Sequence, residues 1–95
     1  MTTTTTATAL TQNASRYLQQ LCKHWAHKMP VDFTDTAGTI RFPSGAVATL
    51  TAHADHIAVG IETPTPDMIP TMQDVVARHL DRFAFREAPL GFVWS

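Results

Sequence analysis

An apolar stripe that ends at a proline is the feature of this sequence that most restricts its fold. Between residues 14 and 29, apolar side chains recur at spacings of three and four residues, the periodicity of one helical face. These side chains are Ala14, Tyr17, Leu18, Leu21, Cys22, Trp25, Ala26 and Met29. Asn13 or Ser15 is suited to cap the start, and Pro30 ends the helix because it disfavours helical geometry in the residue before it. We therefore predict an amphipathic helix whose apolar side packs against the rest of the chain.

Short β-prone segments separated by turn residues follow this helix. They are VDF (31–33), GTIRF (38–42), AVATLTA (46–52) and IAVGIE (57–62). The connection PSG (43–45) contains a glycine that can adopt a positive φ, and HADH (53–56) is a second tight connection. Apolar and small polar residues alternate in these segments, which predicts an antiparallel meander with VDF as a brief strand or an extended lead-in.

A second helix is predicted after the meander. Its apolar stripe consists of Met68, Ile69, Met72, Val75, Val76, Leu80 and Phe83. Pro66 and Pro70 fall in or just before its first turn, where a missing N–H costs nothing. LGFVW (90–94) alternates and predicts a final strand. Together these elements predict an α+β two-layer sandwich in the order α–β–β–β–α–β, with both helices on one face of a mainly antiparallel four-stranded sheet.

The threonine run at the start of the chain has little apolar surface to bury. We expect residues 1–11 to be a disordered tail, with an added edge strand as the alternative, and residues 12–95 to form a single domain. The 44% hydrophobic content is sufficient for a core without disulfides.

Charge and composition restrict the classes of partner and the compartment. Seven basic and eight acidic side chains give a net charge of −1, which predicts binding to neither nucleic acid nor an anionic membrane. No apolar run approaches the roughly 20 residues that span a bilayer, and the N-terminal residues lack the features of a secretory signal. With a single cysteine, the chain is expected to be cytoplasmic.

The stretch CKHWAHKMP (22–30) suggests two kinds of binding site. A basic or neutral helix face carries Arg16, Lys23, His24, His27 and Lys28. These cations either contact an anionic ligand or partner protein, or simply complement the negative end of the helix dipole. Alternatively, His24 and His27 bind zinc, iron or haem together with His53 and His56, if the HADH turn lies against the end of the helix.

His79 and Cys22 both fall on the apolar sides of their helices. His79 is either a half-buried, hydrogen-bonded structural residue or the centre of a pocket between helix and sheet in a small enzyme. Cys22 is expected to be an inert buried thiol. No motif in the chain points to catalysis, and the sequence leaves any cofactor open.

The strand faces opposite the core are small and almost uncharged. They carry Thr39, Val47, Thr49, Thr51, Ala58, Gly60 and Val93. Solvent-facing sheets usually carry more charge, so we expect a homodimer through this open face.

Three segments resemble the bacterial domain-of-unknown-function family 2218. They are SRYLQQLCKHWAHKMPV (15–31), RFPSG (41–45) and DVVARHLDRFAFRE (74–87), and the likeness covers residues 14–95. The resemblance implies a small stand-alone domain, of a kind also found appended to siderophore-interacting flavoproteins that reduce ferric siderophores. It supplies no catalytic residues. The expected function is a non-catalytic binding or accessory module linked to siderophore iron, with a histidine-based metal- or haem-binding protein and a His79 enzyme as alternatives.

Overall fold

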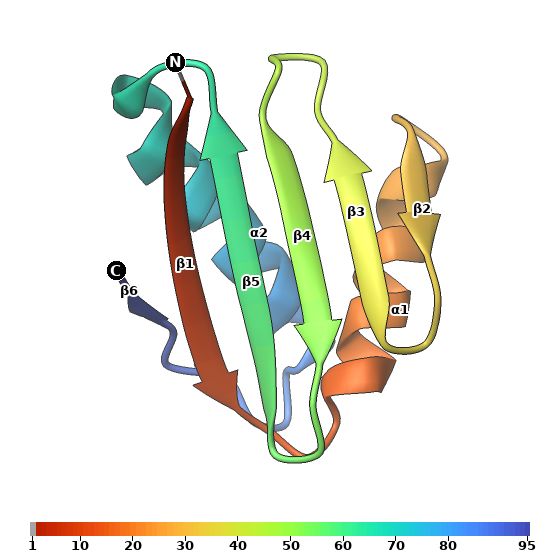
Figure 1. The fold of residues 1–95 in the computed structure, drawn as a ribbon. Coiled ribbons are helices and arrows are strands. Elements are labelled where there is room, and N and C mark those ends of the chain that lie inside the picture. Colours follow the sequence, from red (N-terminus) through yellow and green to blue (C-terminus); the bar gives the residue numbers. More distant parts are fainter. Residues whose placement is uncertain (1) are drawn as a thin grey trace.

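Six antiparallel strands form a single sheet in the computed structural model, which describes residues 2–95 (Figure 1). Their order across the sheet is β2-β3-β4-β5-β1-β6. The strands are β1 (Thr3–Leu10), β2 (Val31–Phe33), β3 (Ala37–Arg41), β4 (Val47–Ala52), β5 (His56–Thr63) and β6 (Val93–Trp94). The predicted meander is confirmed as β2 to β5, and Gly45 adopts a φ of 95° in the turn between β3 and β4. The sheet has six strands rather than the predicted four.

The threonine run forms β1, so the expectation of a disordered tail is wrong for residues 3–10. β1 pairs with β5 along its whole length, from Thr3 opposite Thr63 to Leu10 opposite His56. Its side chains alternate between the two faces, with Thr5, Ala7 and Ala9 buried. The β-propensity of threonine and burial of one small-residue face make this strand stable although its one large apolar side chain, Leu10, is exposed.

Two helices match the two apolar stripes. α1 spans Ala14–Ala26 and α2 spans Ile69–Phe83, preceded by the short 3₁₀ helix η1 (Pro66–Met68). Pro70 lies in the first turn of α2, as predicted. Asn13 occupies the N-cap position of α1, but its side chain makes no capping hydrogen bond. Within residues 2–95, neither helix is long and apolar enough to cross a membrane.

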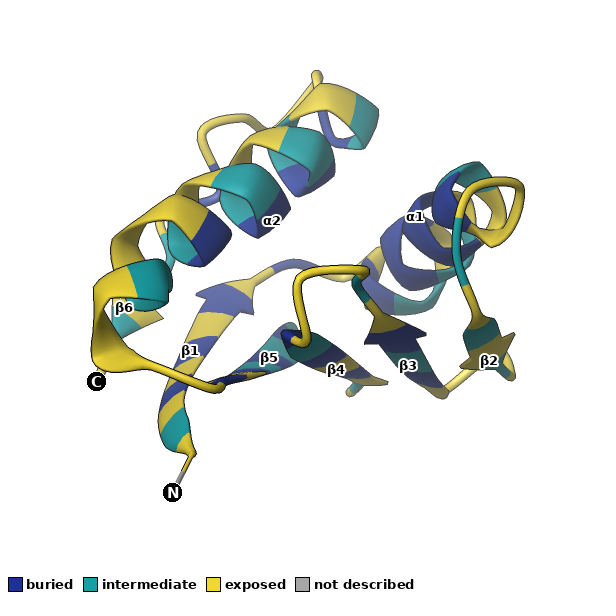
Figure 2. Cartoon of the chain, turned by 90° about the horizontal axis from the view of Figure 1, so that it is seen from above, coloured by how far each residue is buried: buried dark blue, intermediate teal, exposed yellow. Residues whose placement is uncertain are grey.

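Both helices lie on the same side of the sheet, as Figure 2 shows from above. α1 contacts β2, β3, β4 and β5, whereas α2 contacts β5 and β1. The fully buried side chains at this interface include Leu18, Leu21, Ile40, Leu50, Ile57, Ile61, Val76 and Leu80. α1 approaches β3 so closely that a Cβ built on Gly38 would lie 2.7 Å from Cys22 Sγ. The helices thus cover one face of the sheet and leave the other open.

Candidate binding surfaces

Two histidines from different helices come together where α1 and α2 face each other. The ring of His24 on α1 lies 5.6 Å from that of His79 on α2, and 5.8 Å from that of Phe83. His79 also contacts Trp25, at 4.8 Å between ring centroids. We call this region the helix groove and define it by His24 and Lys28 on the α1 side and by Arg78, His79 and Arg82 on α2.

The α2 side of the helix groove is a hollow with two guanidinium groups. Arg78, His79 and Arg82 line a volume of about 350 Å³. His79 is half-buried, and its Nδ1 lies 2.6 Å from the carbonyl oxygen of Val75, so Nδ1 donates to that carbonyl and Nε2 is not used by this bond. Arg78 pairs with Asp74 at 3.1 Å on the exposed side of the helix. The hollow therefore offers donors suited to carboxylate, phosphate or phenolate oxygens.

The electrostatic surroundings of His24 are cationic. Burial lowers the pKa of His24, and His79, Lys28, Arg82 and His27 lower that pKa further. All of these neighbours carry positive charge when protonated, and each disfavours a proton on His24 for that reason. An anion in the helix groove would relieve this repulsion.

The five residues expected to contact an anion are divided between two surfaces. His24 and Lys28 belong to the helix groove, whereas Arg16 and Lys23 line a separate hollow of about 480 Å³ on the outer side of α1. The other residues around that hollow are Gln12, Asn13, Ser15, Gln19 and Gln20. His27 is exposed at the end of α1. Contact of these five residues with an anion stays a prediction, and α2 supplies further positive charge next to His24 through Arg82.

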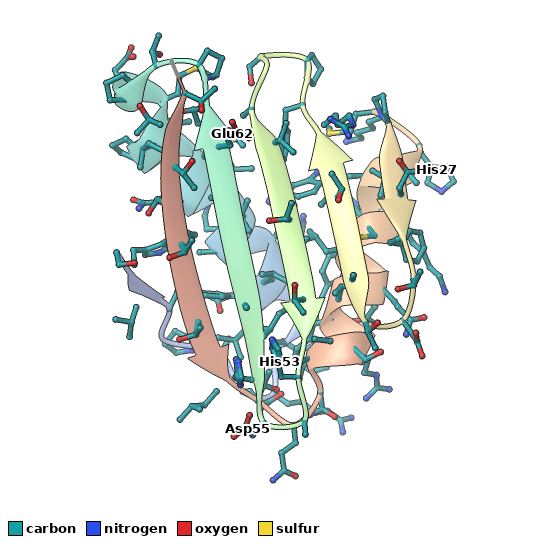
Figure 3. The ribbon with its side chains drawn as sticks, in the orientation of Figure 1. His27, His53, Asp55 and Glu62 are labelled. Carbon is teal, nitrogen blue, oxygen red and sulfur yellow. The ribbon has the colours of Figure 1, made fainter. Side chains whose placement is uncertain are left out.

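The four histidines expected to share a metal lie at opposite ends of the molecule. His53 and His56 stack at 4.2 Å in the turn between β4 and β5, far from His27 in Figure 3. Asp55 accepts a hydrogen bond from His56 at 2.7 Å, and this bond lowers the pKa of Asp55. In the part of the chain that the structure describes, no three or more His, Cys, Asp or Glu side chains are arranged to hold a metal ion. The predicted convergence of four imidazoles is wrong.

The remaining two candidates also have defined positions. His79 lies between the helices, against Trp25, and not in a cleft between α2 and the sheet. Cys22 is fully buried, as predicted, and burial raises the pKa of its thiol to about 11. Such a thiol is almost entirely protonated near neutral pH, which makes it a poor nucleophile.

Glu87 organises a polar cluster that the sequence-based predictions missed. Its carboxylate accepts hydrogen bonds from Tyr17, from Thr11 at 3.0 Å and from Asn13 at 3.2 Å. These bonds, the one from Tyr17 above all, lower the pKa of Glu87. The cluster joins the segment after α2 to the start of α1. Asn13 and Glu87 are 74 positions apart, and only the fold reveals their proximity.

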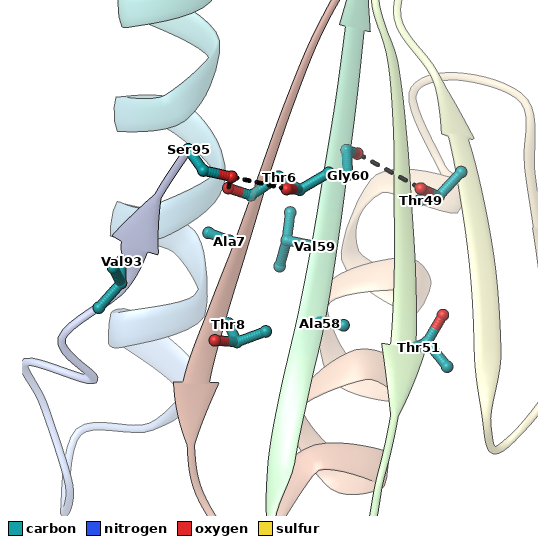
Figure 4. A pocket seen from close by; sticks show the side chains of 10 residues that line it. All are labelled: Thr6, Ala7, Thr8, Thr49, Thr51, Ala58, Val59, Gly60, Val93 and Ser95. Atoms are coloured by element: carbon teal, nitrogen blue, oxygen red, sulfur yellow. Dashed lines mark hydrogen bonds between the residues drawn. The ribbon is translucent and has the colours of Figure 1, made fainter.

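The face of the sheet turned away from the helices, which we call the open face, is almost uncharged. It carries Thr4, Thr6, Thr8 and Leu10 of β1, Ala58, Gly60 and Glu62 of β5, Val47, Thr49 and Thr51 of β4, Thr39 and Arg41 of β3, and Asp32 of β2. Figure 4 shows a shallow hollow of about 480 Å³ over its centre. Thr6 Oγ1 lies 3.0 Å from Ser95 Oγ, and Thr49 Oγ1 donates to the carbonyl of Gly60 at 3.5 Å. The small residues predicted for this face lie on it, and β1 adds three more threonines.

Comparisons with known proteins place this chain in a bacterial family. It is similar to PA4090 from Pseudomonas aeruginosa, whose structure was determined by NMR, with 38% identity and a TM-score of 0.81. The alignment covers 97% of this chain and 94% of that chain. A comparison with curated proteins finds no match. Residues 6–95 match the family DUF2218, described as an uncharacterized protein conserved in bacteria. The chain therefore belongs to the DUF2218 family, which its sequence already resembled.

Proposed function

We propose that this protein is a non-catalytic binding module that takes an anionic ligand or partner in the helix groove. The observation that carries the proposal is the meeting of His24 and His79 at 5.6 Å among the cations Lys28 and Arg82. In a chain with a net charge of −1, such a concentration of positive charge is local and not a property of the whole surface.

The chemistry of the groove favours an anion that also has an aromatic part. Arg82 and Arg78 supply planar donor groups that bind paired oxygens, and Phe83 adds a half-buried ring beside His24. A catecholate or a related aromatic carboxylate presents both features. The imidazole rings of His79 and His24 add flat surfaces that stack on such a ligand.

Ferric siderophores are the ligand class that we propose to test first. Similar domains are appended to siderophore-interacting flavoproteins, and ferric tris-catecholates are anionic and aromatic. On this proposal the protein holds the complex by its outer oxygen atoms and rings, and contributes no ligand to the iron. The charge of the groove supports this arrangement, since Lys28 and Arg82 repel a bare cation.

Titration of the protein with a ferric tris-catecholate, followed by tryptophan fluorescence, tests the proposal. We expect Arg82→Glu to weaken binding at least about tenfold, equivalent to about 1.4 kcal/mol. The matched control, Lys23→Glu, makes the same charge change on the outer side of α1 and should alter the affinity less than about twofold. Citrate and inorganic phosphate serve as anions without an aromatic ring. Equal losses for both variants, or no binding by the wild-type protein, would contradict the assignment to the helix groove.

A further inference from the structure

We infer that a second copy of this chain docks on the open face, related by a twofold axis that runs along β4. The two sheets then pack face to face as a sandwich, with the helices of each copy on the outside. Face-to-face packing with nearly aligned strands is a stable arrangement of two sheets. The inference concerns the side of the molecule away from the helix groove and does not depend on the proposed ligand.

Removing water from the centre of the open face costs little free energy. The residues there are small, and the hydroxyls of Thr6 and Thr49 are already hydrogen-bonded within the sheet, to Ser95 and to the carbonyl of Gly60. Burying a hydroxyl that has a partner avoids the cost of an unsatisfied polar group. Alanine and glycine on β5 also leave room for a close approach of the partner sheet.

The charged residues of the open face select the position of the axis. Arg41, Val47 and Glu62 lie in one row across three neighbouring strands, because Arg41 pairs with Val47 and Val47 pairs with Glu62. A twofold axis along β4 exchanges the positions of β3 and β5. Arg41 of each copy then faces Glu62 of the other copy, and Val47 faces Val47. The arrangement produces two symmetry-related ion pairs at one end of the interface.

The same axis avoids unfavourable contacts elsewhere on the face. Thr39 lies in the row of Thr49 and Gly60, so Thr39 of one copy faces the space above Gly60 of the other. Asp32, which pairs with Thr39, lies on the edge strand β2, so its carboxylate stays at the solvent-exposed rim of the interface, opposite Thr6 of the partner. An axis along β5 would instead place the two Glu62 carboxylates opposite each other, which is repulsive.

The extent of the face sets the strength of the dimer. Five strands about 4.8 Å apart and about six residues long give a planar footprint of about 400 Å². Standard stable interfaces bury about 800 Å² on each partner. We therefore expect a dimer that dissociates in the micromolar range, and one whose affinity depends on the two ion pairs.

Sedimentation equilibrium of the full chain from low to several hundred micromolar concentration, with charge-swap variants, tests the inference. The wild-type protein should form dimers, and Arg41→Glu or Glu62→Arg should each weaken the dimer at least about tenfold. The double variant that carries both substitutions re-forms the pairs in reverse and should return to within about threefold of the wild-type affinity. Lys23→Glu, on the outer side of α1, should leave the dimer unchanged.

Each outcome decides for or against the interface. A monomer at every concentration, or a dimer that neither single substitution weakens, would overturn the inference. Failure of the double variant to recover would also overturn it, because any other axis leaves Arg41 and Glu62 facing different groups. Circular dichroism of each variant shows that it is folded, and a folded variant with lost association can be compared directly with the wild-type protein.

Discussion

The helix layer and the open face of the same molecule have opposite chemistry. Among residues 2–95, Arg41 is the only one of the seven lysines and arginines that lies in a strand, and the others lie in the helices or just after them. The open face carries mainly threonine, alanine and glycine instead. This difference indicates two kinds of recognition, with charge and aromatic rings on the helix layer and flat shape complementarity on the sheet.

The two glycines in the sheet give the largest expected contrast between these sides. A Cβ added at Gly38 meets Cys22 Sγ at 2.7 Å in the core, and one added at Gly60 meets Thr49 Oγ1 at 2.7 Å on the open face. We expect Gly38→Ala to lower the free energy of unfolding by about 2 kcal/mol, because buried neighbours cannot move aside. Gly60→Ala should change it by less than about 0.5 kcal/mol, because the exposed Thr49 side chain can rotate and exchange its 3.5 Å hydrogen bond to the Gly60 carbonyl for one to water. Urea unfolding of both variants measures the contrast, and equal losses would show that the two faces are equally rigid.

Two glutamates allow a second, smaller comparison. Glu87→Gln should lower the free energy of unfolding by about 1 kcal/mol, because the carboxylate accepts bonds from Tyr17, Thr11 and Asn13. Since the pKa of Glu87 in the folded protein is below its ordinary value of 4.5, its contribution is present above pH 4.5 and lost as pH falls through the lower folded value. Thermal unfolding between pH 3 and 7 measures this dependence. Glu62→Gln, at low micromolar protein concentration, is the matched control, and the same loss there would contradict the assigned role of the cluster.

The smallest effect concerns the pH dependence of the helix groove. The pKa of His24 is lowered from its ordinary value of 6.5, so the unfolded chain takes up a proton at this residue more readily than the folded protein does. Above pH 6.5 the ionisation of His24 therefore does not reduce the free energy of unfolding. As pH falls from 6.5 towards the lower pKa of His24 in the folded protein, the unfolded state takes up the proton first and the free energy of unfolding decreases. His24→Gln should reduce the change in the free energy of unfolding between pH 7 and 5.5 by a few tenths of a kcal/mol. His53→Gln, at an exposed imidazole in the turn between β4 and β5, is the control, and an unchanged slope in His24→Gln would contradict the cationic description of the groove.

The parts of the fold that were predictable are those with strong local periodicity. The stripes from Ala14 to Met29 and from Met68 to Phe83 indicated both helices, because large apolar side chains at helical spacing give a strong signal. β1 was missed because its buried residues, Thr5, Ala7 and Ala9, are small and resemble a low-complexity tail. Its pairing with β5 depends on contacts between residues far apart in the sequence, from 46 positions for Leu10 and His56 to 60 positions for Thr3 and Thr63.

The candidate sites were predictable only within single elements. Helical spacing correctly placed Cys22 in the core and His79 on the side of α2 that packs against neighbours. It did not reveal that His24 contacts His79 or that Glu87 contacts Tyr17, because both contacts depend on how the elements pack. The open face was predicted from alternation in β3, β4 and β5 but without the three threonines of β1. Periodicity identifies the face on which a residue lies, and only tertiary packing determines its neighbours.

The place of β1 in the sheet has a consequence for the order in which the chain folds. During synthesis residues 3–10 leave the ribosome well before their partner β5, which follows only after α1 and three other strands. β6, which pairs with the other edge of β1, is made later than β5. The meander from β2 to β5 can form from local contacts before β1 pairs. Pairing of β1 with β5 is slow because it closes a long loop that contains α1 and the strands β2 to β4. Until then the threonine-rich segment is an unpaired strand, and because Leu10 is its only large apolar side chain, the segment has little tendency to aggregate.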